Sequence, residues 1–176
     1  MSIFYYDETL SAYESHFLWE QALGYLEKRY AERKENKILN TLVGFSWLYF
    51  IEGPIISKKF ENDQNGSALN TWRKYIDLGA AESPEDPFFC FIAGYTLSLH
   101  GFHISESYEK KGHSLMEACL RFTNDPWLQQ LAENILLNEH AKQYHPLQNG
   151  QQICRQFFDG KSLLDQYFNE VFLGSS

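Results

Sequence analysis

The stretch "SPEDPFFCFIAGYTLSLHG", residues 83–101, decides the fold of this chain. It opens with an acidic turn in which Asp86 precedes Pro87, a pair typical of a helix N-cap and first turn. Apolar side chains then recur at three- and four-residue spacings, as on one face of a helix. From Pro87 to His100 the segment is 14 residues long, whereas a typical strand has about 5 or 6. The stretch therefore predicts a helix.

The same turn recurs 39 positions later, where Asp125, Pro126 and Trp127 open "DPWLQQLAENILL". An amphipathic helix is also predicted before each turn, over residues 68–80 and 108–122. A unit of helix, Asp-Pro turn and helix is thus repeated along the chain. Such a repeat predicts a stack of helical hairpins, an architecture that commonly presents an extended binding surface.

The predicted fold class is all-α, a single-domain stack of antiparallel helical hairpins. One helix is expected from residue 10 to residue 30, and a second, apolar nearly all round, from 37 to 51. The second should be central, because a helix without a polar face must be covered on every side. At 176 residues the chain has the size of one domain. The predicted helix pairs span residues 10–52, 66–101 and 105–143, with capping helices over 149–173 broken at Gly160.

Two segments resemble the tetratricopeptide repeat. "GYTLSLHG" at 94–101 resembles part of its first helix, and "LMEACLRFTNDP" at 115–126 resembles its second helix, with a small residue at Ala118 and a closing Asn-Asp-Pro. The resemblance covers about residues 66–143 and implies a tetratricopeptide-like α-solenoid, a fold that binds peptides or proteins.

Charge is unevenly distributed along the chain. The net charge is −8 and the isoelectric point about 5.2, which disfavours direct binding to nucleic acid. Residues 25–74 carry nine basic and six acidic side chains, whereas residues 1–24 and 75–109 carry acidic side chains and no Lys or Arg. We take these acidic side chains as the candidate partner-binding residues: Asp77, Glu82, Glu85, Asp86, Glu106 and Glu109 as one group, with Asp7 and Glu8 as a second.

The N-terminal stretch "IFYYDETLSAYESHF", residues 3–17, interleaves aromatic rings with carboxylates and is a further candidate binding edge. Aromatic residues reach 16% of the chain, so they must fill a core or an interaction surface. At helical spacing elsewhere in the chain they are assigned to the core.

Cysteine use and hydropathy predict a cytoplasmic protein without a membrane segment. Cys90, Cys119 and Cys154 lie far apart within apolar helical patterns, as expected for reduced, buried thiols. The first residues show no basic and apolar leader. The longest apolar run, residues 41–51, is shorter than the about 20 residues that a spanning helix needs.

No motif of catalysis or cofactor binding is recognised, so the chain is predicted to be neither an enzyme nor a metal or cofactor protein. His100 and His103 could share a metal, but Gly101 should end the helix between them, and no third ligand stands at defined spacing. The helix dipole should instead favour the charged form of His100. No phosphate-binding loop, nucleophile elbow or C-x-x-C pair occurs.

In size, acidity, aromatic richness and degenerate repeat, the chain is similar to bacterial immunity proteins, in particular those of contact-dependent growth inhibition systems. This resemblance implies binding and neutralisation of a cognate toxin, a basic nuclease, whose active site would be covered by the acidic segment 77–109. Two alternatives stay open. One is an adaptor or co-chaperone that binds peptide segments; the other is a small metal-dependent hydrolase that uses His100, His103 and Glu106.

Overall fold

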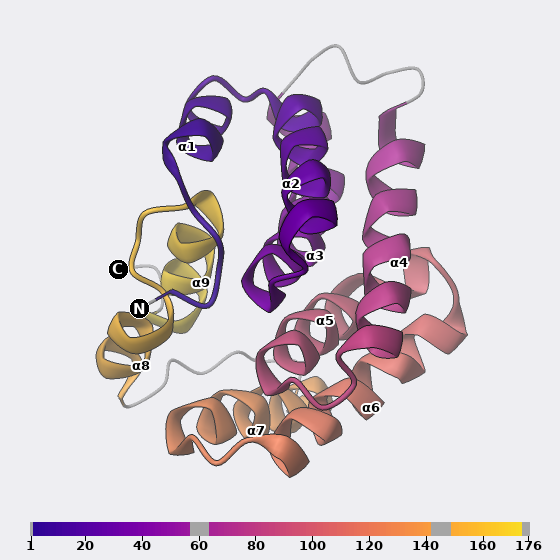
Figure 1. The fold of residues 1–176 in the computed structure, drawn as a ribbon. Coiled ribbons are helices and arrows are strands. Elements are labelled where there is room, and N and C mark those ends of the chain that lie inside the picture. The colour runs from indigo at the N-terminus through magenta and orange to yellow at the C-terminus, as the bar shows by residue number, and fades with distance from the viewer. Residues whose placement is uncertain (1, 57–63, 142–148, 174–176) are drawn as a thin grey trace.

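In a computed structural model the chain is all-α, as predicted, and the structure describes residues 2–56, 64–141 and 149–173. No strand occurs within these ranges (Figure 1). The helices are α1 (Glu8–Ser15), α2 (Trp19–Arg33), α3 (Asn36–Ile56), α4 (Gln64–Glu82), α5 (Pro87–His100), α6 (Glu106–Phe122), α7 (Pro126–Ala141), α8 (Gly150–Phe157) and α9 (Leu163–Leu173), with a 3-10 turn, η1 (Gly101–His103), after α5. The predicted end of the third helix pair, residue 143, lies outside the described residues.

Helix α3 is the centre of the molecule, as its apolar sequence predicted. Every residue from Ile38 to Tyr49 is buried. The helix contacts α2, α4, α5 and α9, so that it has neighbours on several sides. In Figure 1, α4 lies along one edge of the stack and α8 and α9 along the opposite edge.

Helices α5 and α6 approach each other closely where they cross. A Cβ atom added at Gly94 would lie 3.0 Å from the backbone nitrogen of Met116, and one added at Gly112 would lie 2.8 Å from that of Ser98. Both glycines therefore lie where the backbones of the two helices come close together. Helices α3 and α4 also pack extensively, whereas α4 and α5, which the first Asp-Pro turn joins, touch little.

Both Asp-Pro turns cap their helices as predicted. The Asp86 carboxylate accepts a hydrogen bond from the backbone N–H of Phe89 at 2.7 Å, at the start of α5. The Asp125 carboxylate accepts one from the backbone N–H of Trp127 at 2.8 Å, at the start of α7. These carboxylates satisfy helix N–H groups that have no partner within the helix.

The chain breaks where a single helix from residue 10 to residue 30 was expected. Phe17 has a φ of +55° and separates α1 from α2. The N–H groups of Phe17 and Leu18 bond the carbonyls of Glu14 (3.1 Å) and Tyr13 (2.9 Å). This is the Schellman arrangement, whose left-handed position is usually glycine. A bulky residue there costs about 1 kcal/mol or more.

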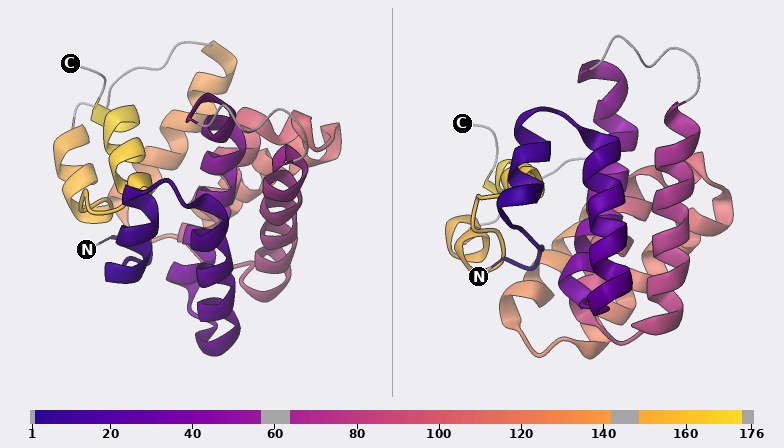
Figure 2. Two further views of the ribbon diagram at one scale, coloured as in Figure 1. Left: turned by 90° about the horizontal axis from the view of Figure 1, so that it is seen from above. Right: turned by 45° about the horizontal axis from the view of Figure 1, so that its top comes forward.

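This turn folds α1 back against α2, so the prediction of one helix was wrong for a tertiary reason. Helix α2 packs on α3, while α1 reaches α9, where the Glu14 carboxylate accepts a hydrogen bond from the Leu163 N–H at 3.2 Å. Both views in Figure 2 place α1 beside the C-terminal helices. The predicted break at Gly160 is confirmed, since its φ is +80°.

Candidate functional site

The structure does not bring the acidic candidates of residues 77–109 together. Asp86 caps the N-terminus of α5, whereas Glu106 and Glu109 lie in the first turn of α6, beyond its other end. A helix of 14 residues, rising about 1.5 Å per residue, is about 21 Å long. The candidates therefore fall into two groups at opposite ends of α5.

Several of these carboxylates already hold helices together. Asp77 on α4 accepts hydrogen bonds from Tyr108 Oη (2.5 Å) and Lys111 Nζ (2.8 Å), both on α6. Burial raises the pKa of Asp77, but the hydrogen bonds from Lys111 and Tyr108 outweigh it and the net shift is downward. Asp77 therefore links α4 to α6 as a carboxylate.

Other members of the same group have partners as well. Glu82 accepts a hydrogen bond from Tyr30 Oη at 2.8 Å and lies 3.6 Å from Lys34 Nζ. Asp86 accepts a second bond from the Asn36 side chain at 2.6 Å. The remaining members are exposed: Glu106 pairs with Lys110 at 2.5 Å, and Glu85 and Glu109 form no ion pair with another described residue.

In the second predicted group, Asp7 has a structural role, whereas Glu8 is exposed. Asp7 caps α1 by accepting from the Leu10 N–H (2.9 Å), and it also accepts the hydroxyl hydrogen bonds of Tyr5 and Tyr25. Burial raises the pKa of Asp7, but these hydrogen bonds and the charge of Arg29 lower it overall. Glu8 is exposed in the first turn of α1.

The His100 side chain lies half-buried at the edge of the core. Trp47 Nε1–H donates to His100 Nδ1 at 3.1 Å. Burial, together with the charge of His103, lowers the pKa of His100, so the expectation that the helix dipole favours its charged form is reversed. No group of three or more His, Cys, Asp or Glu in the described ranges could hold a metal ion.

The three cysteines are buried and free, in line with the sequence prediction of buried thiols. Burial raises the pKa of Cys90 and of Cys119 to about 12, and that of Cys154 to about 11. A thiol with such a pKa is almost wholly protonated near neutral pH and is a poor nucleophile.

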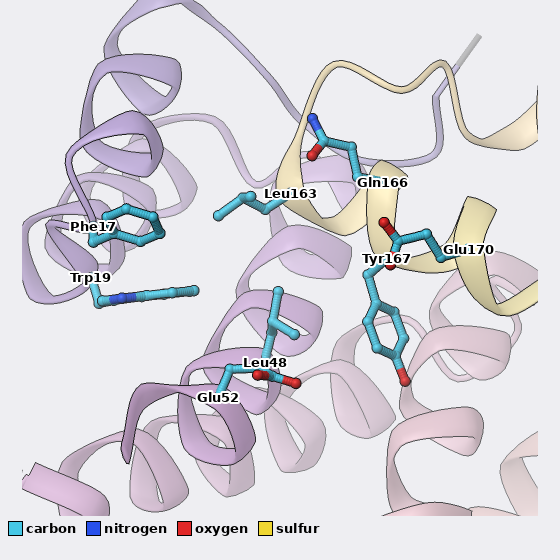
Figure 3. A pocket seen from close by; sticks show the side chains of 8 residues that line it. All are labelled: Phe17, Trp19, Leu48, Glu52, Leu163, Gln166, Tyr167 and Glu170. Carbon is cyan, nitrogen blue, oxygen red and sulfur yellow. The ribbon is translucent and has the colours of Figure 1, made fainter. Parts of the chain in front are cut away.

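A different set of residues surrounds a cleft of about 270 Å³ between the α1–α2 turn, α3 and α9. Figure 3 shows Phe17 and Trp19 on one side of this space, with Tyr167 and Glu170 on the other. Glu52 on α3 supplies a second carboxylate, and Leu48, Leu163 and Gln166 complete the lining. We call this site the acidic cleft.

The aromatic walls of the acidic cleft are held in place by the core. Trp19 is 6% exposed and stacks on Tyr49, with ring centres 5.3 Å apart and planes 2° from parallel. Tyr167 packs edge-on against Trp47 at 5.2 Å, and its hydroxyl lies 3.1 Å from that of Tyr95. These contacts fix the rings before any ligand arrives, which reduces the entropy lost on binding.

The carboxylates of the acidic cleft differ from those of residues 77–109. Neither Glu52 nor Glu170 forms an ion pair or a side-chain hydrogen bond with another described residue, and no Lys, Arg or His of the described ranges lines the cleft. Burial raises the pKa of Tyr167, the hydrogen bond with Tyr95 opposes this shift, and the charge of Glu52 adds to it. The negative charge of Glu52 therefore acts on the Tyr167 side chain.

None of the cleft carboxylates was among the predicted site residues. Glu52 and Glu170 come from distant parts of the sequence, and no local pattern connects them. The one signal that pointed here was the aromatic and acidic stretch 3–17, whose last residue, Phe17, lies at the cleft.

Comparison with known proteins identifies no relative: no family model, no curated protein and no solved structure matches the chain. Within the described residues, no helix has both the length and the apolar character to cross a membrane.

Proposed function

We propose that this chain is a binding protein that neutralises a basic protein partner, as an immunity protein does for its cognate bacterial toxin, and that the acidic cleft is the centre of its binding surface. The observation that carries this proposal is the pair of cleft carboxylates, Glu52 and Glu170, which have no ion-pair partner among the described residues and lie beside fixed aromatic rings. Such a site complements a positive charge.

The surface next to the cleft supplies apolar contact area. Phe17 is 55% exposed and Leu18 is 39% exposed, both in the turn between α1 and α2. Aromatic side chains at the centre of an interface contribute most of the binding energy when a surrounding rim excludes water. A basic partner seated here would bury both side chains and cover the two carboxylates.

The acidic segment 77–109 has a different role in this proposal. Its carboxylates are divided between two ends of α5 and several are paired, but they contribute to the net charge of −8. A field of that sign attracts a basic partner over distances of about a Debye length and raises the association rate. We therefore assign long-range steering to the segment and close contact to the cleft.

The test is bacterial growth while the coding region immediately upstream is induced with and without this chain. We expect growth arrest by the upstream product and rescue by the chain. The double variant Glu52→Lys/Glu170→Lys should lose rescue. Glu85→Lys/Glu109→Lys, which changes the net charge equally at exposed sites on the acidic segment, should retain it.

A harmless upstream product, or a toxic one that the chain does not rescue, would contradict the proposal. Equal loss of rescue in both double variants would contradict the assignment to the cleft. Urea unfolding of each purified variant shows whether a loss reflects unfolding. The adaptor alternative requires basic side chains to clamp an acidic peptide, and its candidates are Arg73, Lys74, Lys110 and Lys111. The three lysines each lie within 3.0 Å of a carboxylate of the chain itself, which leaves Arg73 of these four.

A further inference from the structure

The backbone conformation at Phe17 indicates that its ring serves ligand binding and is not needed for folding. Its φ of +55° is the left-handed conformation, in which glycine is favoured and a bulky residue is strained. The hydrogen bonds that Phe17 and Leu18 form in the turn use backbone groups only, so glycine at position 17 could form them equally well. The ring itself is more than half exposed and lines the acidic cleft. Residues kept in such strained conformations cluster at ligand-contacting positions.

The size of the acidic cleft limits what it can hold. Pockets for small-molecule ligands typically measure about 300 to 1,000 Å³. At about 270 Å³ the cleft lies just below that range. It therefore suits the end of one long side chain and not a nucleotide-sized cofactor.

The chemistry of the lining selects a cation with flat faces. Aromatic faces attract cations, and arginine more often than lysine is found stacked on them. The guanidinium is planar and carries five N–H donors that match carboxylate oxygens, whereas an ammonium is a strongly hydrated point charge. Here carboxylates stand on two different helices, Glu52 on α3 and Glu170 on α9, with the rings of Phe17, Trp19 and Tyr167 around the same space (Figure 3).

We propose that the acidic cleft binds one arginine side chain of the basic partner, with the guanidinium between Glu52 and Glu170 beside the ring of Tyr167, and with the ring of Phe17 on the opposite side of the cleft (Figure 3). This inference rests on the proposed function, because it names the group by which the partner is recognised. The arginine is an exposed side chain of the partner, since the cleft opens to solvent between three elements of this chain.

The experiment is a nuclear magnetic resonance titration of the full chain with propylguanidinium, which carries the head group of arginine. Butylammonium, with the same charge, and butylurea, which is neutral, are the comparison ligands. We expect propylguanidinium to shift the Trp19 indole and the Leu163 and Tyr167 amide signals. Its affinity should exceed that of butylammonium at least threefold, and butylurea should give no saturable shift. Equal affinity for the two cations, or shifts confined to other surfaces, would overturn the proposal.

Variants with equal charge changes test the two carboxylates. Glu52→Gln/Glu170→Gln should weaken propylguanidinium binding at least tenfold. Glu85→Gln/Glu109→Gln, exposed residues on other elements, should change it less than twofold. Equal weakening in both would mean that the ligand responds to overall charge and not to the cleft.

Phe17→Gly separates the ring from the fold. Because glycine relieves the strained backbone, the variant should unfold at the same or a higher urea concentration, so a binding defect cannot be attributed to unfolding. Its affinity for propylguanidinium should fall at least threefold. Unchanged affinity in a folded variant would remove Phe17 from the site.

The titration and the growth assay can reject the arginine assignment and the proposed function independently of each other. Growth rescue without propylguanidinium binding would reject the arginine assignment and leave neutralisation of a basic partner standing. Specific propylguanidinium binding without rescue would reject the toxin partner and keep the cation site.

Discussion

The acidic segment 77–109 and the acidic cleft carry the same kind of group in opposite circumstances. In the segment, Asp77 and Glu82 contact Lys111 and Lys34, and Asp86 caps a helix. In the cleft, Glu52 and Glu170 have no comparable partner among the described residues. A dense run of carboxylates in a sequence therefore shows where acidic side chains are concentrated along the chain. The fold decides which of them remain unpaired and can contact a partner.

Some of the cations that pair with the acidic segment come from the basic stretch next to it in the sequence. Lys34 belongs to residues 25–74, which are net positive, and it approaches Glu82 of residues 75–109. Lys111 follows the segment and returns to Asp77, 34 positions earlier. Charges that are segregated along the chain are interleaved by the helical stack.

The largest effect that we predict concerns Glu14, a carboxylate near the acidic cleft. It is buried, unlike the carboxylates of the acidic segment and of the cleft. Glu14 is 7% exposed, and one of its oxygens has no hydrogen-bond partner among the described residues. Burial raises the pKa of Glu14 from 4.5 to about 7; the Leu163 N–H opposes this shift and the charge of Asp165 adds to it.

Because the folded state then binds a proton more tightly than the unfolded state, stability should fall as pH rises from about 4.5 to about 7. The decline should amount to about 2 to 3 kcal/mol. Asp165, whose pKa burial also raises, adds a change of the same sign. Urea unfolding at a series of pH values measures this.

Glu14→Gln, which cannot titrate, should remove most of the decline, whereas Glu20→Gln on the exposed side of α2 should leave it unchanged. Parallel pH profiles for the wild-type chain and Glu14→Gln would show that folding does not raise the pKa of Glu14.

The second effect concerns neighbouring carboxylates within the acidic segment. Asp86→Ala removes the cap of α5 and the bond from Asn36, and should cost about 1 to 2 kcal/mol of unfolding free energy. Glu85→Ala, one position earlier and exposed, should change stability by less than about 0.5 kcal/mol. Urea unfolding compares the two, and equal values would mean that the Asp86 contacts contribute nothing.

A smaller effect is expected at the link between α4 and α6. Asp77→Asn should cost about 0.5 to 1 kcal/mol at low salt, because it weakens a partly exposed ion pair and the hydrogen bond from Tyr108. The difference should shrink in 1 M salt, where exposed charges are screened. The lowered pKa of Asp77 further implies that its contribution is lost as pH falls below about 4. A cost that does not depend on salt or pH would assign the effect to packing.

The smallest effect on stability is expected in the cleft itself. Glu170→Gln should leave the free energy of unfolding within about 0.5 kcal/mol of the wild-type value, since the exposed carboxylate contacts no described cation. The same substitution should weaken partner binding. A clear loss of stability would place Glu170 with the structural carboxylates and remove the contrast between the two regions.

Local sequence signals predicted the parts of the fold that depend on neighbouring residues. The caps at Asp86 and Asp125 follow from the preference of aspartate before proline at a helix start. The break at Phe17 was missed because the signal for such a turn is normally glycine, and here Phe17 holds that position where α1 folds against α2, α2 packs on α3, and Glu14 of α1 bonds the Leu163 N–H of α9.

By itself the sequence determined the all-helical class, the capped turns, the central position of α3 and the acidic balance of the chain, because each depends on local preference, periodicity or a sum over residues. Tertiary structure decided which carboxylates form ion pairs and which lie beside aromatic rings without a cation. Glu52, Glu170 and Phe17 meet only when α3, α9 and the α1–α2 turn pack together. The electrostatic energy of a charge depends on its distance to other charges in space, a quantity that order along the chain does not contain.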